Sequence, residues 1–339
     1  MNLSTPRFDM KPTEKFALKA TIFVLLNVLF WLLLYAAFTP DVTIFGNAGK
    51  SRITLNSENV CELKITSDIT ISESDNDKHY DFVLMGSSRA KRFAGMVGRA
   101  ITQGILGMRF FNLAKSGSGI LPENVYLAYF FGTHNQTKVV VYFLDPFVFY
   151  SPTWNEQYSD FDEGPYSGVI LWELLRGNFD RKVVDDYLRY RLNPLPDLNR
   201  LPDLNRRNPN DDCSSNGNTH SLSQGAVEKA IKNYYDFGLD QFYFDKHASA
   251  LANEIKVSKS HGATTIFILP PNLWGEDPGK ARLLDLLSRY KEQYGTEFYD
   301  LSNSVPDSML YSDTSHLNCE GVIYFTERFL KPILSHRRP

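Results

Sequence analysis

The chain has 339 residues, of which 43% are hydrophobic and 22% charged, and its formal net charge is −3. This composition is typical of a folded globular protein and excludes a wholly disordered chain. Because there is no excess of positive charge, we exclude nucleic acid as a partner. Once a tail and an anchor are subtracted, the remaining length corresponds to one large domain.

The first predicted element is a membrane-spanning helix over residues 20–38, which contain no charged side chain. At about 1.5 Å per residue this segment is about 28 Å long, enough to cross the hydrocarbon core of a bilayer. A buried soluble helix is the alternative, but a helix that is apolar on every face would need complete enclosure. No later segment approaches spanning length, so we predict a single-pass membrane protein.

The charges around residues 20–38 predict their orientation. The basic residues of the preceding flank are Arg7, Lys11, Lys15 and Lys19. The following flank is acidic or neutral, so the positive-inside rule makes residues 1–19 a cytoplasmic tail and the main domain extracytoplasmic, either periplasmic or extracellular. A cleaved signal peptide is the alternative. The long apolar run and the lack of a convincing cleavage site favour an uncleaved signal anchor.

Residues 39–79 are polar with short alternating runs, which predicts a stalk or a peripheral hairpin. The domain predicted over 80–336 then alternates apolar strands with segments of helical length. The predicted strands are 81–86, 109–113, 139–144, 264–269 and 297–301. The predicted helices are 92–104, 121–133, 240–261, 278–294 and 319–334. This alternation is typical of an α/β fold whose parallel sheet is covered by helices on both faces.

An insertion over residues 150–238 separates the third predicted strand from the fourth. Its predicted helices are 169–177, 181–192 and 225–236. Between them a hexapeptide, Leu-Pro-Asp-Leu-Asn-Arg, occurs twice in succession over 195–206. Two copies of six residues cannot build a solenoid, so we predict a surface loop there.

The first strand leads directly into Gly86-Ser87-Ser88-Arg89. Ligands of parallel α/β sheets bind beyond the carboxyl ends of the strands, so this turn is well placed for a reacting group. A serine at the start of the next helix also has a free backbone N–H that can donate to an oxyanion. The alternative is that Ser87 or Ser88 only caps this helix.

A second motif, Asp313-Thr-Ser-His316-Leu-Asn318, precedes the last predicted helix. A serine hydroxyl needs a base such as imidazole to accept its proton, and the imidazole needs a carboxylate to hold its tautomer. The spacing allows Asp313 and His316 to face one cleft. The alternative is that Asn318 caps the last helix and His316 is merely exposed.

Taken together, these motifs resemble those of the SGNH hydrolases, also called GDSL-like. In that family a Gly-Asp-Ser block follows the first strand and an Asp-x-x-His block precedes the last helix. Here Gly86-Ser87-Ser88 replaces the middle Asp by Ser, and Asp313 with His316 matches the second of these blocks. The family's Asn-x-Gly-x-x-Gly block is matched by residues 112–117, where Ala114 replaces the first Gly.

The resemblance implies a three-layer SGNH- or flavodoxin-like fold and gives each matching residue a role. Ser88 would be the nucleophile, His316 the base, and Asp313 the residue that orients His316. The backbone N–H of Gly117 would donate to the oxyanion, and Asn112 would belong to the same block. The N-terminal anchor and the Ser-Ser variant are most similar to a branch of extracytoplasmic SGNH-like proteins that partner membrane-bound O-acyltransferases, such as the D-alanyl transfer protein.

One block departs from the family pattern. After the third strand, SGNH enzymes place an Asn that completes the oxyanion hole, and here Asp145 occupies that position. An ionised carboxylate cannot donate a hydrogen bond and would repel an oxyanion. Asp145 therefore turns away, is protonated, or is replaced as donor by its neighbours Ser87 or Arg89. Alternatively, Asp145-Pro146 is only a strand-ending turn, or the domain mainly binds.

The remaining residues suggest no metal site and no cofactor. His134, His220, His247 and His261 lack metal-ligand spacing. A disulfide between Cys61 and Cys213 is one possibility, and three unpaired cysteines are the other. Trp274 either stacks on a sugar or packs in the fold.

Three functions follow from the sequence. The first is a serine esterase or O-acyltransferase for acyl esters of cell-surface glycans or glycolipids. The second is a non-catalytic accessory protein that binds glycan or docks on a membrane-bound O-acyltransferase. The third is a structural envelope protein that uses the insertion as its interaction surface.

Overall fold

The computed structural model describes residues 19, 21–30, 79–156, 167–177, 179–192, 213 and 224–337. Residues 21–30 are helical, and the rest of the predicted anchor lies outside the described residues. The predicted stalk also lies outside them, apart from His79. In the part of the chain that the structure describes, no helix has the length and apolar character needed to cross a membrane. The anchor therefore stays a prediction.

The main sheet in the described part contains five parallel strands in the order β3–β2–β5–β6–β7. Its strands are β2 (Phe82–Gly86), β3 (Phe110–Asn112), β5 (Val139–Phe143), β6 (Thr264–Leu269) and β7 (Glu297–Asp300). Each lies within one residue of its predicted ends, so the predicted parallel α/β sheet is confirmed. The sequence analysis missed a two-stranded parallel sheet of β1 (His79–Tyr80) and β4 (Gln136–Thr137).

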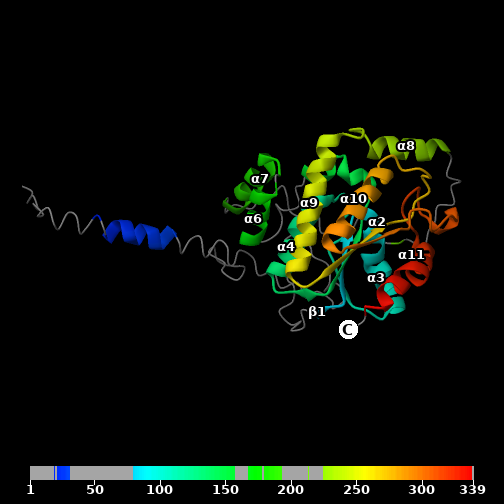
Figure 1. Cartoon of the computed structure of the whole chain (residues 1–339), viewed down its shortest axis with the longest axis horizontal. Coiled ribbons are helices and arrows are strands. Elements are labelled where there is room, and N and C mark those ends of the chain that lie inside the picture. The colour runs from blue at the N-terminus through cyan, green and yellow to red at the C-terminus, as the bar shows by residue number, and fades with distance from the viewer. Residues whose placement is uncertain are drawn as a thin grey trace, which may run out of the picture.

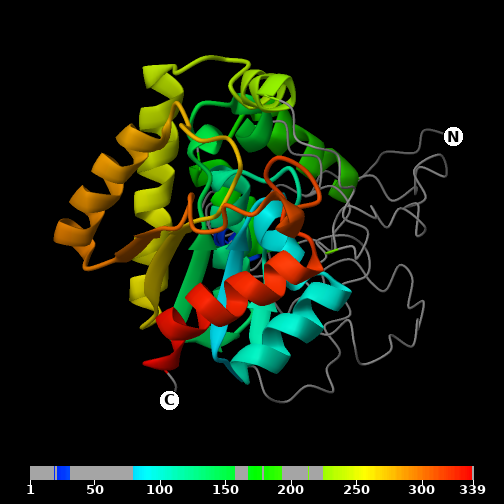
Figure 2. The same cartoon turned by 90° about the vertical axis from the view of Figure 1, so that its right-hand side faces the viewer.

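Helices cover both faces of the sheet because successive strand residues alternate between two apolar clusters. Val83 and Met85 belong to one cluster, and Phe82 and Leu84 belong to the other. The helices of the first cluster include α4 (Ile120–Gly132), α9 (Gln241–Ser260) and α10 (Lys280–Tyr294). Those of the second include α2 (Ser88–Ala94), α3 (Met96–Leu106) and α11 (Cys319–Phe325). Figure 2 shows α3 and α11 side by side over this second face.

The region predicted as one helix over 92–104 is helical but is divided by Gly95 into α2 and α3. Gly95 has extended backbone angles, φ −62° and ψ 170°, so the helical hydrogen-bond pattern stops there. Its N–H closes α2 on the carbonyl of Lys91, and its carbonyl accepts from Arg99 to open α3. The predicted last helix contains α11, a π-helical segment η7 (Thr326–Leu330) and α12 (Lys331–Ser335).

The described parts of the insertion are helical at the predicted places. Its longer helices are α6 (Gly168–Arg176), α7 (Arg181–Leu192) and α8 (Gln224–Tyr234). Figure 1 shows α6 and α7 next to α4 at one side of the domain. The sequence analysis missed two short elements, the 3-10 helix η2 (Pro146–Phe149) and α5 (Pro152–Glu156). The duplicated hexapeptide lies outside the described residues.

Candidate active site

Ser88 follows the carboxyl end of β2, the strand that lies between β3 and β5 in the main sheet. β2 is followed in the chain by β3 on one side and later by β5 on the other, so this is a topological switch point. Gly86 allows the sharp turn, since its φ is +135° and a Cβ would lie 2.6 Å from the Phe143 carbonyl oxygen. Ser88 is then the first residue of α2 and is half-buried.

The structure brings Ser88, His316 and Asp313 into one hydrogen-bonded chain. The Nε2 atom of His316 lies 2.7 Å from the Oγ atom of Ser88. On the other side of the ring, Nδ1 lies 2.7 Å and 2.9 Å from the two carboxylate oxygens of Asp313. The predicted proximity is therefore confirmed, while the catalytic roles of these residues stay predictions.

The loop that carries Asp313 and His316 is held by its own backbone. The Oδ1 atom of Asp313 accepts the backbone N–H groups of Ser315 and His316, both at 2.8 Å. The N–H of Ser312 donates to the His316 carbonyl, which closes the loop. Asn318 caps α11 by accepting from the Gly321 N–H at 2.9 Å. Asn318 is thus a cap, as one alternative proposed, but His316 is not merely an exposed residue.

Hydrogen bonds keep Asp313 ionised. Burial by itself would raise the pKa of Asp313, but the His316 imidazole and the N–H groups of Ser315 and His316 outweigh it and hold this pKa well below its usual value. An ionised Asp313 accepts the proton on Nδ1 of His316. Nε2 is then the acceptor for the Ser88 hydroxyl, which is the arrangement that a general base requires.

The Asp145 carboxylate pairs with two buried neighbours. Ser87 donates its hydroxyl to Asp145, and Nε of Arg89 lies 3.0 Å from the other carboxylate oxygen. All three residues are at least 95% buried. The Ser87 hydroxyl is thus engaged by Asp145, while the role of Ser87 or Arg89 as a replacement oxyanion donor stays a prediction.

The loop after β3 presents Gly117 at the surface. The N–H of Lys115 donates to the Gly86 carbonyl at 2.9 Å, which holds this loop against the turn before Ser88. Gly117 has a left-handed φ of +79° and is exposed. Asn112 is buried and accepts from the Ala114 N–H at 2.8 Å, so it shapes this loop. In the described part of the chain, the Ser88 and Gly117 N–H groups have no hydrogen-bond acceptor.

Four aromatic rings lie beside this site, and the sequence analysis singled out only one of them as an individual residue, Trp274. The others are Phe147, Trp154 and Tyr234. Trp154 and Tyr234 were missed because they belong to opposite ends of the insertion, and only the fold brings them together.

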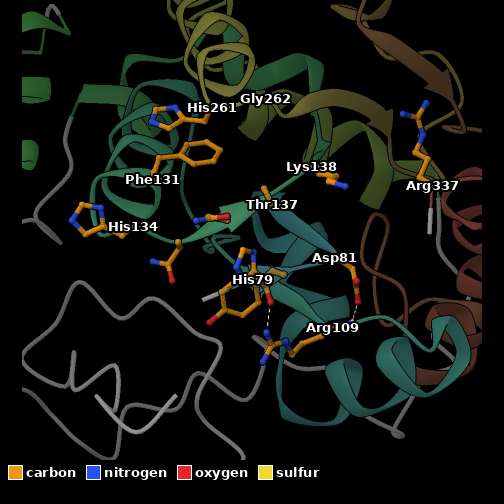
Figure 3. A pocket seen from close by; sticks show the side chains of 13 residues that line it. His79, Asp81, Arg109, Phe131, His134, Thr137, Lys138, His261, Gly262 and Arg337 are labelled. Atoms are coloured by element: carbon orange, nitrogen blue, oxygen red, sulfur yellow. Dashed lines mark hydrogen bonds between the residues drawn. The ribbon is translucent and has the colours of Figure 1, made fainter. Parts of the chain in front are cut away.

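A hollow of about 1020 Å³ lies at the opposite edge of the sheet (Figure 3). Asp81, Arg109 and Lys138, which precede β2, β3 and β5, line it together with His79 and several other basic residues. Arg109 donates to the His79 carbonyl, as the dashed line in Figure 3 shows. The hollow contains none of the residues of the hydrogen-bonded chain, so it is separate from the candidate active site.

Two of the cysteines can be described. Cys213 is buried, and the Cys319 thiol donates to the Cys213 carbonyl. Cys61 lies outside the described residues. In the residues that the structure describes, no cluster of three or more His, Cys, Asp or Glu side chains is arranged to hold a metal ion.

The sequence matches no protein-family model and none of the curated proteins. A similar solved structure is that of a Bacteroides fragilis protein provisionally described as an acylhydrolase. It is 11% identical, with a match that covers 86% of this chain and 100% of the other and a TM-score of 0.37. This degree of likeness carries no argument about function, which the geometry of the site has to supply.

Proposed function

We propose that this protein is a serine esterase or O-acyltransferase of the SGNH type. Its substrates are acyl esters of cell-surface glycans or glycolipids. The observation that carries the proposal is the hydrogen-bonded chain from Asp313 through His316 to Ser88, with 2.7 Å at each step. A serine hydroxyl becomes a strong nucleophile when an oriented imidazole takes its proton.

The residues divide the reaction between them. The Ser88 oxygen attacks the acyl carbonyl carbon while Nε2 of His316 takes the hydroxyl proton. The N–H groups of Ser88 and Gly117 stabilise the oxyanion of the tetrahedral intermediate. His316 then gives the proton to the departing alcohol oxygen, which leaves the acyl group on Ser88. Water completes hydrolysis, whereas a second sugar hydroxyl completes transfer.

The pairing of Asp145 makes this chemistry compatible with a carboxylate near the site. A free carboxylate would repel the oxyanion. Here the Arg89 guanidinium and the Ser87 hydroxyl offset the charge of Asp145 within a buried network. The remaining cost is one missing side-chain donor, which typically lowers kcat by about 10²–10³-fold. We therefore expect a slower enzyme than an SGNH hydrolase with the usual Asn.

We further propose that residues 20–38 anchor the protein in a membrane with the catalytic domain outside. The uncharged apolar run and the basic flank before it support this proposal. An extracytoplasmic location suits an enzyme for surface glycans. A membrane-bound O-acyltransferase, which supplies acyl groups across the membrane, is the proposed protein partner.

A serine-reactive fluorophosphonate probe tests the proposal on the full-length protein. We expect labelling at Ser88, and Ser88→Ala should lower labelling and ester hydrolysis by at least about 10³-fold. Ser288→Ala is the control, because it removes an exposed serine hydroxyl on α10 and leaves the proposed nucleophile and the Asp145 network intact. Labelling that persists in Ser88→Ala, or a folded wild-type protein that is neither labelled nor active, would contradict the proposal.

A second candidate is the catalytically weak accessory protein, and the observation that favours it is Asp145 in the position of the usual donor. This protein would bind glycan or dock on an acyltransferase. The intact chain of Ser88, His316 and Asp313 favours the enzyme instead. The fluorophosphonate experiment separates the two candidates, because a binding protein does not require a reactive Ser88.

A further inference from the structure

The insertion supplies two half-buried aromatic rings next to the proposed active site. Trp154 comes from α5, and Tyr234 is the last residue of α8. The ring centroids lie 5.8 Å apart, and the planes differ by 24°. Both rings contact Phe147, at centroid distances of 5.4 Å and 4.4 Å. The two ends of the insertion thus meet at one place, directly after β5.

These rings reach both parts of the catalytic machinery. A Cβ built on Gly117 would lie 3.9 Å from Cζ3 of Trp154, so this ring lies against the loop that carries the proposed oxyanion donor. The Tyr234 hydroxyl lies beside the Ser315 side chain and within electrostatic range of Asp313. Trp154 therefore flanks the oxyanion side of Ser88, and Tyr234 flanks the acid–base side.

Two deeper side chains hold the half-buried rings of Trp154 and Tyr234 in place. Phe147 and Trp274 are 2% and 5% exposed, and the Trp274 ring lies 5.0 Å from that of Tyr234. Trp274 donates its ring N–H to the Thr314 hydroxyl at 3.1 Å, which ties it to the loop of Asp313 and His316. The Arg89 guanidinium packs 4.9 Å from the Trp274 ring centre. The support is therefore buried and rigid.

The chemistry of this surface matches a sugar ring better than an acyl chain. Rigid aromatic faces offer apolar contact area, and nearby hydroxyl groups supply hydrogen bonds, which is the usual composition of a small-molecule site. A pyranose has C–H groups that pack on an aromatic face and hydroxyl groups that bond to a polar rim. An acyl chain has no use for the hydroxyl groups of Tyr234 and Ser315.

The position of Tyr234 also indicates which half of the ester lies there. His316 gives its proton to the departing alcohol, so the alcohol half of the substrate lies on the side of the 313–316 loop. Tyr234 lies on that same side. The ring next to the acid–base loop is thus placed for the alcohol half.

We propose that Trp154 and Tyr234 form the subsite for the alcohol half of the ester, and that this half is a pyranose ring. The inference rests on the proposed esterase function and assigns its substrate specificity to the insertion. Phe147 and Trp274 are positioning residues beneath the subsite. Trp154 and Tyr234 contact the sugar itself.

Steady-state kinetics of the full-length protein test the inference. The substrates are a methyl O-acetyl-glucopyranoside and ethyl acetate, which share the acyl group but differ in the alcohol half. In Trp154→Ala and Tyr234→Ala, we expect the ratio of kcat/KM for the pyranoside to kcat/KM for ethyl acetate to fall about five- to tenfold. The matched controls are Trp172→Ala and Phe242→Ala, which remove rings that are 50% and 69% exposed on other helices. These controls should leave the ratio unchanged.

The other possible results of these kinetic measurements distinguish failure of the subsite from failure of the proposed function. An unchanged ratio in both ring variants would overturn the inference, as would an altered preference between acetyl and butyryl esters of the same pyranoside, which would assign the rings to the acyl half. If the wild type hydrolyses neither ester, the proposed function has failed.

Calorimetric binding of the O-acetyl-glucopyranoside to Ser88→Ala then still decides the subsite. Binding that is lost in the ring variants supports it, and no binding at all overturns it.

Discussion

At the scale of single residues, the most informative position is Asp145. Its carboxylate joins Ser87 and Arg89 in a network that is almost completely buried. Arg89 follows the proposed nucleophile directly in the chain, so this network also holds the first turn of α2. Where SGNH hydrolases have an Asn, this chain therefore has a buried ion pair that positions the turn.

Replacing Asp145 by the Asn that SGNH hydrolases have at this position should lower the stability of the protein and not raise its activity. Asp145→Asn leaves the buried Arg89 without its partner charge, and breaking a buried pair in this way costs about 3–5 kcal/mol. We expect that loss in the free energy of unfolding, measured with urea, and no gain in ester hydrolysis. Asp285→Asn is the control, because its pair with Arg289 is exposed and contributes at most about 1 kcal/mol. An increase in activity would mean that Asp145 faces the oxyanion.

At the scale of elements, α9 and α4 hold η2 and α5, which carry Phe147 and Trp154 of the proposed subsite and its support. Nδ1 of His247 in α9 lies 2.8 Å from the Phe149 carbonyl oxygen at the end of η2. Asn155 in α5 donates to the Val148 carbonyl at 2.7 Å and accepts from the Leu121 N–H of α4 at 3.0 Å. Because His247 and Asn155 are both completely buried, their hydrogen bonds fix η2 and α5 against α9 and α4.

His247 makes the stability of the contact between α9 and η2 dependent on pH. Burial lowers the pKa of His247 from 6.5 to about 4, because desolvation disfavours the imidazolium. Between these two pH values the unfolded chain binds the proton and the folded protein does not, so stability falls as the pH falls. The expected loss from this residue is about 3 kcal/mol between pH 6.5 and 4.

Urea unfolding at several pH values measures this contribution. In His247→Gln the free energy of unfolding should fall less steeply between pH 6.5 and 4 than in the wild type. His261→Gln, which changes an exposed ring at the end of the same helix, is the control. Equal slopes for the wild type and His247→Gln would show that His247 has the same pKa in the folded protein and in the unfolded chain.

At the scale of the whole molecule, the sheet separates two different surfaces. The carboxyl ends of the strands carry Ser88 and its partners, and the amino ends border the hollow of basic residues in Figure 3. β1, where the chain coming from the predicted anchor enters the domain, lines that hollow. The chain thus enters the domain at the edge opposite the proposed chemistry.

The proposed anchor predicts how the whole protein fractionates. Full-length protein should stay with membranes after alkaline carbonate extraction, and a variant that lacks residues 1–38 should be released. A membrane-impermeant thiol reagent should label Cys319, which is partly exposed, in intact cells. Release of the full-length protein by carbonate, or labelling only after lysis, would contradict the anchor or its orientation.

The sequence by itself determined the strands, most of the helices and the residues that meet at Ser88. Strands of a covered parallel sheet are apolar on both faces, so they are recognisable as short runs, and the motif residues follow strand ends whose position the sheet dictates. Only the tertiary structure decided that Asp145 faces Ser87 and Arg89 and that Trp154 meets Tyr234. Such contacts join residues far apart in the chain, and side-chain packing, which no local pattern encodes, selects them.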